Sequence, residues 1–220
     1  MMKNYVEVTY QEKEKPFGEY PLQLAAYLMK RYHLKKGMTI LDNGCGRGEF
    51  LHVFSHLGMN ASGADVSEYC KDARIVDLNK DLLPFPDNYF DAVFSKSVME
   101  HINNTEHYMS EMRRVLKVGG ILILMVPDWE TSYKIFYQDP THVHPYTVKS
   151  VERLLEMYEY NDIEVEKFIQ LPSTWNDSFV RAISKMVRIM GPVNKVYKNK
   201  FIRFSRELMV LGSGRKCQEV

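Results

Sequence analysis

The chain of 220 residues is 45% hydrophobic and carries 29 lysines and arginines against 28 acidic residues, for a net charge of +1. This length and apolar content suit one domain of ordinary size, and the balanced charge gives no support for nucleic acid as a partner. Three cysteines, Cys45, Cys70 and Cys217, form neither a CxxC pair nor a disulfide framework, which predicts a reduced, cytoplasmic protein. The first residues lack the apolar core of a secretory signal, and the longest purely apolar run, 121–127, is too short to cross a bilayer.

Short apolar runs alternate with amphipathic stretches over the first 127 residues. The pattern predicts strands that end at Asp42, Asp65, Asp77, Ser95 and Pro127, the last four beginning near residues 60, 73, 90 and 121. Helices are expected at 21–32, from residue 49 to Gly58, and from a cap at Thr105 to the pair Gly119-Gly120. The unbroken run 121–127 is typical of a parallel-sheet strand that is buried on both faces. This alternation predicts an α/β fold of the doubly wound kind.

The last third of the chain departs from this rhythm. Residues 147–160 form an amphipathic pattern with Thr147 as the expected N-cap, and 163–171 alternate as a half-buried strand does. Residues 205–213 supply a final strand, and the last two strands can form an antiparallel edge on the parallel sheet. We therefore divide the chain into three parts within one domain. They are an N-terminal arm and helix (1–36), a core (37–171 plus 203–216) and a helical basic insertion (172–202).

The stretch "ILDNGCGRGEF" places Gly44, Gly46 and Gly48 directly after the first strand. A dinucleotide fingerprint needs its third glycine at position 49, which here is Glu49. A pyrophosphate would meet this carboxylate at the start of a helix, which disfavours a nicotinamide-dependent oxidoreductase. The loop predicts either a tight strand-to-helix turn or a site for a ligand without phosphate. S-adenosylmethionine, with its cationic sulfonium and ammonium groups, meets that condition.

Polar groups at successive strand ends support the ligand site. A carboxylate at Asp65 can accept two hydrogen bonds from a ribose diol. Asp77 can accept from an adenine amino group, with Leu78 packing on the ring. Ser95 closes the fourth strand, near where the methionine portion would lie.

In combination these stretches resemble the class I S-adenosylmethionine-dependent methyltransferases. "ILDNGCGRGEF" is similar to their first motif, "GADVS" to the second, "DLNKDLLPFPDNYFDAVFSKSVMEHI" to the third and fourth, and "EMRRVLKVGGILILMVP" to their characteristic helix and fifth strand. The resemblance implies a Rossmann-like, mostly parallel seven-stranded sheet with an antiparallel edge strand and a helical insertion before the last strand. The implied residues that bind S-adenosylmethionine are Asp42, Gly44, Cys45, Gly46, Asp65, Val66, Asp77, Leu78 and Ser95.

Histidines are the candidate catalytic residues, because the sulfonium methyl is already activated and a hydroxyl acceptor needs only a base. His101 lies in "MEHI", and His142 and His144 lie in "DPTHVHPYT". His101 can instead buttress the loop after the fourth strand, and the second segment can be purely structural or, with Asp139, chelate a metal. The "MEHI" stretch resembles part of a metal-assisted motif of quinone-pathway O-methyltransferases, but Ser97 stands where that motif has an acid. We therefore predict no metal.

The acceptor is expected to be a hydroxyl. "SKSVME" follows the fourth strand where many amino-group methyltransferases carry Asn/Asp-Pro-Pro-Tyr, which disfavours nucleic-acid bases and glutamine amides. Segments similar to "DPTH" occur in methyltransferases of bacterial cell-surface carbohydrate pathways, which implies a small or carbohydrate-linked hydroxyl. Two alternatives stay open: a methyltransferase of quinone, lipid or other small acceptors, and a non-catalytic S-adenosylmethionine-binding module that serves as a membrane or complex partner.

The insertion is basic, with eight lysines or arginines and no acid from Arg181 to Arg206. Its helical pattern predicts one apolar face made of Phe179, Ala182, Ile183, Met186, Val187 and Met190. Three interpretations remain: a lid helix packed on the core, a site for an anionic substrate, and a peripheral contact of residues 179–206 with the inner face of the membrane. The oligomeric state is not predicted.

Overall fold

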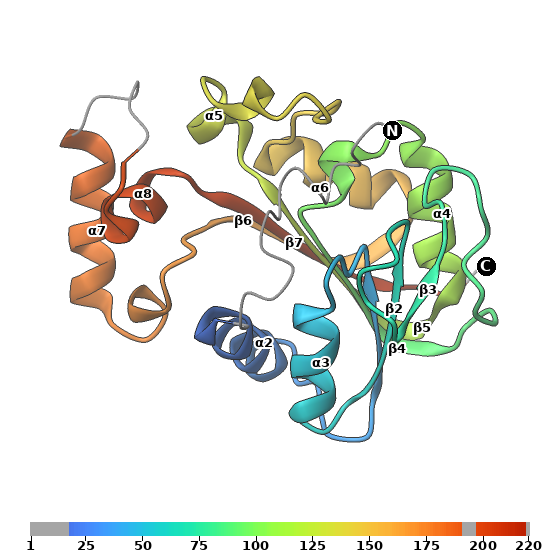
Figure 1. The fold of residues 1–220 in the computed structure, drawn as a ribbon. Helices are drawn as coiled ribbons and strands as arrows, with labels where there is room; N and C mark the ends of the chain where they lie inside the picture. Colours follow the sequence, from blue (N-terminus) through green and yellow to red (C-terminus); the bar gives the residue numbers. More distant parts are fainter. Residues whose placement is uncertain (1–17, 191–196, 219–220) are drawn as a thin grey trace.

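Residues 18–190 and 197–218 are described by a computed structural model, in which one seven-stranded sheet lies between helices (Figure 1). The strands are β1 (Thr39–Asn43), β2 (Asn60–Asp65), β3 (Ala73–Ile75), β4 (Phe90–Lys96), β5 (Leu116–Pro127), β6 (Tyr160–Phe168) and β7 (Met209–Lys216). The α-helices are α2 (Glu19–Arg31), α3 (Glu49–His56), α4 (Thr105–Val115), α5 (Trp129–Ser132), α6 (Val148–Met157), α7 (Ser178–Met190) and α8 (Lys200–Arg206). Short 3-10 helices lie at η1 (Met99–His101), η2 (Phe136–Gln138) and η3 (Pro172–Thr174).

The strand order β3-β2-β1-β4-β5-β7-β6 confirms the expected doubly wound sheet. Strands β1 to β5 pair in parallel, while β7 pairs antiparallel with both β5 and β6. The antiparallel strand therefore lies one position inside the edge, which β6 forms. The chain runs outward from β1 to β3 and then returns to β4 on the other side of β1. Ligands of such sheets bind beyond the carboxyl ends of the strands at this reversal point.

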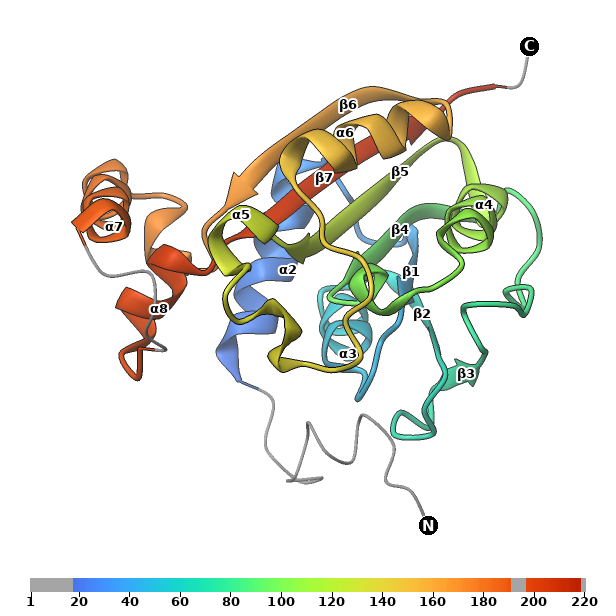
Figure 2. The ribbon, with the colours of Figure 1, turned by 90° about the horizontal axis from the view of Figure 1, so that it is seen from above.

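Two apolar layers cover the two faces of the sheet, and β5 shows why its sequence is apolar throughout. Ile121, Ile123 and Met125 face a cluster with α2 and α3, whereas Leu122 and Leu124 face a second cluster with α4 and α6. All five side chains are at most 4% exposed. Burial of each such side chain stabilises the fold by about 1.5–3 kcal/mol, so the central strands hold the sheet edge rigidly in place. Figure 2 shows α4 and α6 on one side of the sheet and α2 and α3 on the other.

Both expected boundaries of α4 were wrong. The pair Gly119-Gly120 does not end a helix: α4 ends at Val115, and the glycines lie in an irregular part of β5 where pairing with β4 shifts register. The N-cap of α4 is Asn104, whose side chain accepts from the His107 N–H, in place of Thr105.

The third and last strands also differ from expectation. Strand β3 ends at Ile75, because Asp77 begins a turn in which its carboxylate accepts from the Asn79 N–H. The last strand begins at Met209, because residues 200–206 form α8, which is capped by the Asn199 side chain. By contrast, the expected N-cap Thr147 is confirmed, since its hydroxyl accepts from the Ser150 N–H and completes a capping box.

The insertion is helical as expected, but it does not pack as a lid on the core. Helices α7 and α8 stand beyond the β6 and β7 end of the sheet, away from α3 (Figures 1 and 2). Most of the face expected to be inward is outward, with Phe179 73% and Met190 84% exposed. Residues 191–196 of the insertion and 1–17 of the N-terminal arm lie outside the described residues.

Candidate functional site

The glycine loop links the carboxyl ends of β1 and β2. The Gly44 N–H donates to the Ala64 carbonyl at 2.7 Å, and the Gly46 N–H donates to the Asp65 carboxylate at 2.8 Å. Gly44 has a φ of +87°, and a Cβ there would lie 2.2 Å from a methyl group of Val98, so both the backbone and the space require glycine. A Cβ on Gly46 would meet nothing within 4 Å, because this residue borders open space.

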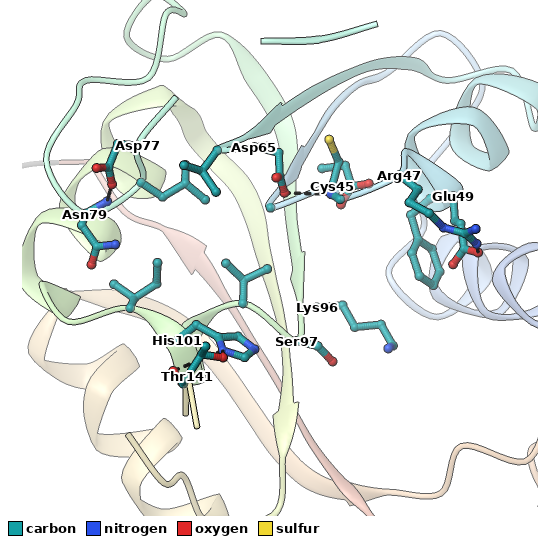
Figure 3. A pocket seen from close by; sticks show the side chains of 18 residues that line it. Cys45, Arg47, Glu49, Asp65, Asp77, Asn79, Lys96, Ser97, His101 and Thr141 are labelled. Carbon is teal, nitrogen blue, oxygen red and sulfur yellow. Dashed lines mark hydrogen bonds and ion pairs between the residues drawn. The ribbon is translucent and has the colours of Figure 1, made fainter. Parts of the chain in front are cut away.

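That open space is a cavity of about 370 Å³ at the sheet reversal point, a size typical of small-molecule sites. Eight of the nine residues predicted to bind the cofactor line it: Asp42, Gly44, Cys45, Gly46, Asp65, Val66, Asp77 and Leu78. Figure 3 shows the side chains of Cys45, Asp65 and Asp77 around the same hollow as those of Lys96, His101 and Thr141. The glycine loop is therefore both a tight strand-to-helix turn and part of the wall of a ligand-sized cavity.

The cavity is electrostatically suited to a cation. Four carboxylates line it, from Asp42, Glu49, Asp65 and Asp77, against one arginine and one lysine. The arginine, Arg47, lies 2.5 Å from the Glu49 carboxylate and partly neutralises it. The Glu49 carboxylate, which we expected to repel a pyrophosphate, is thus paired with Arg47. Acidic residues still outnumber basic residues in the lining.

Asp42 is the most unusual of these acids. It is 3% exposed, and its Oδ2 has no hydrogen-bond partner among the described residues. Burial raises the pKa of Asp42 to about 7, with the nearby Asp65 charge adding to the shift. An orphaned buried carboxylate at the wall of a cavity stabilises a cationic ligand group, since the ligand supplies the missing partner. The residues present therefore fit a nucleoside that carries a positive charge.

Asp65 is held in a fixed orientation at the end of β2. One carboxylate oxygen accepts from the Gly46 N–H, and the other accepts from the Ser67 N–H at 2.8 Å and its hydroxyl at 2.6 Å. A carboxylate offers about four lone-pair positions and the protein fills three, so one remains for a ribose hydroxyl. Hydrogen bonds within the protein thus preorganise this acid beside the glycine loop.

Asp77 lies across the cavity from the loop, at its rim. Its pKa is lowered because the Asn79 N–H donates to it, and Lys80 lies 3.2 Å away. Leu78 is 8% exposed and lines the adjacent wall. A fixed acceptor beside an apolar side chain is the arrangement that an adenine ring needs.

Ser95 is the predicted cofactor residue that the structure does not bring to the cavity. Its hydroxyl is buried and hydrogen-bonded to the Tyr108 hydroxyl at 2.8 Å, and it is not part of the lining. The next two residues, Lys96 and Ser97, line the cavity instead. Sequence reasoning missed both, although a lysine that ends an apolar strand is an available signal. Burial lowers the pKa of Lys96, and Ser97 has a φ of +57°, a backbone strain that is typical of functional loops.

His101 lies at the wall of the cavity opposite the glycine loop. Its Nδ1 lies 2.9 Å from the Thr141 hydroxyl, which itself donates to Asp139 at 2.6 Å. Because the hydroxyl has given its only proton to Asp139, it must accept from His101, so Nδ1 carries the imidazole proton. Burial, together with the neighbouring His142, lowers the pKa of His101, which keeps the ring neutral and makes Nε2 a proton acceptor.

The other two candidate histidines lie behind His101. The His142 ring is 4.7 Å from the His101 ring, and its Nδ1 lies 2.7 Å from the Phe136 carbonyl. His144 is exposed, and its N–H donates to the Glu100 carbonyl. Neither His142 nor His144 lines the cavity. Of the three candidate histidines, His101 alone borders it.

Glu100 adds a buried acid that sequence reasoning did not single out. It is 1% exposed, with Oε2 unpartnered among the described residues, and burial raises its pKa to about 8. Ligand atoms of Glu100, His101 and His142 lie within 4.8 Å of one another and can hold a metal ion. Among the described residues, the chelating set considered from sequence, Asp139 with His142 and His144, does not come together. A second cluster elsewhere consists of His52, Cys70 and Asp72.

Comparison with known proteins gives the family. A methyltransferase domain family matches residues 11–165. The chain is 30% identical over 182 residues to an uncharacterized protein of Methanocaldococcus jannaschii, covering 79% of each. It is 34% identical to a sterol 24-C-methyltransferase of Gibberella zeae, over 43% of this chain and 29% of that protein. It is 26% identical to a ubiquinone/menaquinone biosynthesis C-methyltransferase of Shewanella frigidimarina, over 57% and 58% of the two chains.

Solved structures share the fold. A S-adenosylmethionine-dependent methyltransferase of Archaeoglobus fulgidus has a TM-score of 0.67 at 21% identity, covering 97% of this chain and 100% of that one. A methyltransferase of Haloferax volcanii, solved with the activator Trm112, has a TM-score of 0.72 at 16% identity, covering 99% and 100%. Among the described residues, no helix is long and apolar enough to cross a membrane. The chain belongs to the class I S-adenosylmethionine-dependent methyltransferases, and S-adenosylmethionine is its cofactor.

Proposed function

We propose that this methyltransferase modifies a hydroxyl group of a small or carbohydrate-linked acceptor, with His101 as the general base. The observation that carries the proposal is the chain of hydrogen bonds from Asp139 through Thr141 to His101 at the cavity wall. It fixes the imidazole in the tautomer that can accept a proton from the acceptor. Oriented base and lined cavity together favour an enzyme over a non-catalytic binding module.

Each part of the cavity has a role in this proposal. S-adenosylmethionine supplies an electrophilic methyl group on a positively charged sulfur. Asp42 would neutralise positive charge of the cofactor, Asp65 would accept from its ribose, and Asp77 with Leu78 would hold its adenine. As the acceptor oxygen bonds the methyl carbon and the carbon–sulfur bond breaks, the sulfonium would become a neutral thioether and the hydroxyl proton would pass to His101 Nε2. Asp139 stabilises the resulting imidazolium through Thr141, and alignment in the cavity supplies the rest of the rate enhancement.

A second candidate is methylation of carbon in a lipid acceptor. It is favoured by the similarity to sterol and quinone C-methyltransferases. The same imidazole can remove a proton from carbon as from oxygen, so the site geometry serves both. The chain spans only 29% and 58% of those two relatives, and their acceptors come to this chain as a hypothesis.

A screen with ¹³C-methyl-labelled S-adenosylmethionine tests the proposal. Nucleotide sugars, lipid-linked sugars, phenols, quinone precursors and sterols are offered in turn, and carbon NMR of the product distinguishes O-methyl from C-methyl. We expect a methyl ether, formed by the wild type and lost in His101→Gln. His107→Gln is the matched control. His107 lies on α4, its ring forms a hydrogen bond with the Asp81 carbonyl, and it does not line the cavity. A C-methyl product would select the second candidate, and full activity of His101→Gln would refute the assigned base.

A further inference from the structure

Helix α7 buries only part of its apolar surface. Its inward side is mixed: Val180, Ile183 and Val187 are half-buried there, and Ser184 is fully buried, with its hydroxyl 2.8 Å from that of Ser205 on α8. On the same side, Arg188 donates to the Ser205 carbonyl, and Arg206 donates to the Val187 carbonyl. These hydrogen bonds help attach α7 to α8. A helix of a globular protein normally turns its apolar stripe inward and its charged side outward.

The outward side of α7 is apolar. Phe179 is 73% exposed, Met186 56%, Ile189 83% and Met190 84%. Together with exposed Ala182, these residues recur at the three- and four-residue spacing that forms one continuous stripe on a helix. We call these five residues the α7 stripe. Scattered exposed apolar side chains are ordinary, but a contiguous exposed stripe marks an interaction surface.

The charge around the stripe selects the partner. Exposed Lys185 lies next to Ile189 on the helix surface, and the sequence from Arg181 to Arg206 contains no acid. Arg188 and Arg206 bond backbone carbonyls on the inward side, so among the described residues Lys185 is the cation that lies beside the stripe. A basic amphipathic helix binds anionic lipid by burying its apolar side while its cations lie near the headgroups. A second copy of the chain would bring two such basic segments together, so like-charge repulsion opposes a dimer through this face.

The position of α7 fits an encounter with a membrane. In the sequence, α7 comes after β6 and before β7. Strand β7 begins at Met209, which pairs with Pro127 at the carboxyl end of β5. The cofactor cavity opens at the carboxyl ends of the same sheet. Both views of the fold show α7 and α8 projecting from the body of the sheet (Figures 1 and 2). The exposure of its side chains shows that the stripe is accessible.

We propose that the α7 stripe docks this enzyme on anionic membranes. The proposal goes beyond the proposed O-methylation and does not rest on it, because binding to vesicles needs neither cofactor nor acceptor. Sedimentation with phosphatidylcholine vesicles, with and without phosphatidylglycerol, measures the partition coefficient of the full chain. We expect binding to the anionic vesicles, and weakening of that binding as salt is raised.

Matched variants distinguish binding through the α7 stripe from nonspecific adsorption to vesicles. Met186→Ser with Ile189→Ser should lower the partition coefficient by at least about 10-fold, because two apolar anchors are lost. Met157→Ser removes a methionine that is 75% exposed on α6 and should leave it unchanged. Lys185→Gln should weaken binding to anionic vesicles about five-fold, whereas Lys35→Gln should not, because exposed Lys35 precedes β1 at the amino ends of the parallel strands.

Three results would overturn the proposal. The first is absence of binding to anionic vesicles by a chain that still binds S-adenosylmethionine. The second is equal binding by the wild type and the double stripe variant, with circular dichroism showing that both are folded. The third is a dimer, detected by light scattering, that dissociates when the stripe is changed, since a second copy would then cover this face.

Discussion

Replacing Asp42 by asparagine should weaken binding of S-adenosylmethionine and, at the same time, stabilise the ligand-free protein. The two effects have one cause, which is a buried carboxylate with an unpartnered oxygen at the cavity wall. Its pKa is about 7 in the folded protein against about 3.9 in an unfolded chain. Three units at about 1.4 kcal/mol each place the cost of keeping it ionised at roughly 4 kcal/mol at most.

The sign of the pH dependence follows from that direction. Because folding raises the pKa of Asp42, its contribution to the free energy of unfolding is fully present below about pH 4 and is lost as the pH rises through 7. Binding of a cation has the opposite sign, since the ligand favours the ionised carboxylate. Affinity of the wild type should therefore fall about ten-fold between pH 8 and pH 6, with protons released on binding.

Calorimetry and urea unfolding measure both effects in one pair of variants. At pH 8, Asp42→Asn should lose about 1.5–3 kcal/mol of S-adenosylmethionine binding, the usual worth of a hydrogen bond to a charged group, and should bind with little dependence on pH. Asp91→Asn is the control: Asp91 bonds Thr39 and Lys117 at the other end of the sheet, and its pKa is lowered. That variant should lose stability and keep its affinity. Unchanged binding by Asp42→Asn, or a flat wild-type affinity from pH 6 to 8, would refute the reasoning.

Four further predictions concern the same cavity. Asp65→Ala should weaken S-adenosylmethionine binding by about 1–3 kcal/mol in calorimetry, because a ribose hydrogen bond and the order of the glycine loop are lost; an unchanged affinity removes Asp65 from the site. His101→Gln should lower kcat by about 10²- to 10⁴-fold while the cofactor Kd stays within about three-fold. Gly44→Ala should cost more unfolding free energy than Gly46→Ala, since only its Cβ would clash with Val98. Treatment with EDTA should leave turnover unchanged; loss of turnover that Mg²⁺ or Zn²⁺ restores would assign the Glu100 cluster to a metal.

The sheet was predictable because its signals are local. Asp65 ends β2 as expected, β1 ends at Asn43, one residue beyond the expected Asp42, and β5 alternates its apolar side chains between two buried faces. The errors arose where tertiary contacts override local preference. The pair Gly119-Gly120 has the appearance of a helix stop but lies in a strand, at a register shift opposite β4 that no local pattern reveals.

The cofactor-binding residues were easier to predict from the sequence than the residues of the proposed acceptor side. The cofactor end follows from consecutive residues at strand ends, so eight of its nine predicted residues line the cavity. The acceptor end joins η1 to the distant loop that carries Thr141, and only the folded chain shows that His101, rather than His142 or His144, borders the cavity. The direction of the α7 stripe was likewise hidden, because a helical period shows that one side is apolar but not whether that side faces the core.

A crystal structure of the chain with S-adenosylhomocysteine, the demethylated product, tests the central claim most directly. The account predicts density for the nucleoside above Gly44 and Gly46, with a ribose hydroxyl within hydrogen-bond distance of Asp65 and its amino-acid end near Asp42. A product molecule bound at any other place on the chain, with this cavity left to solvent, would contradict the account.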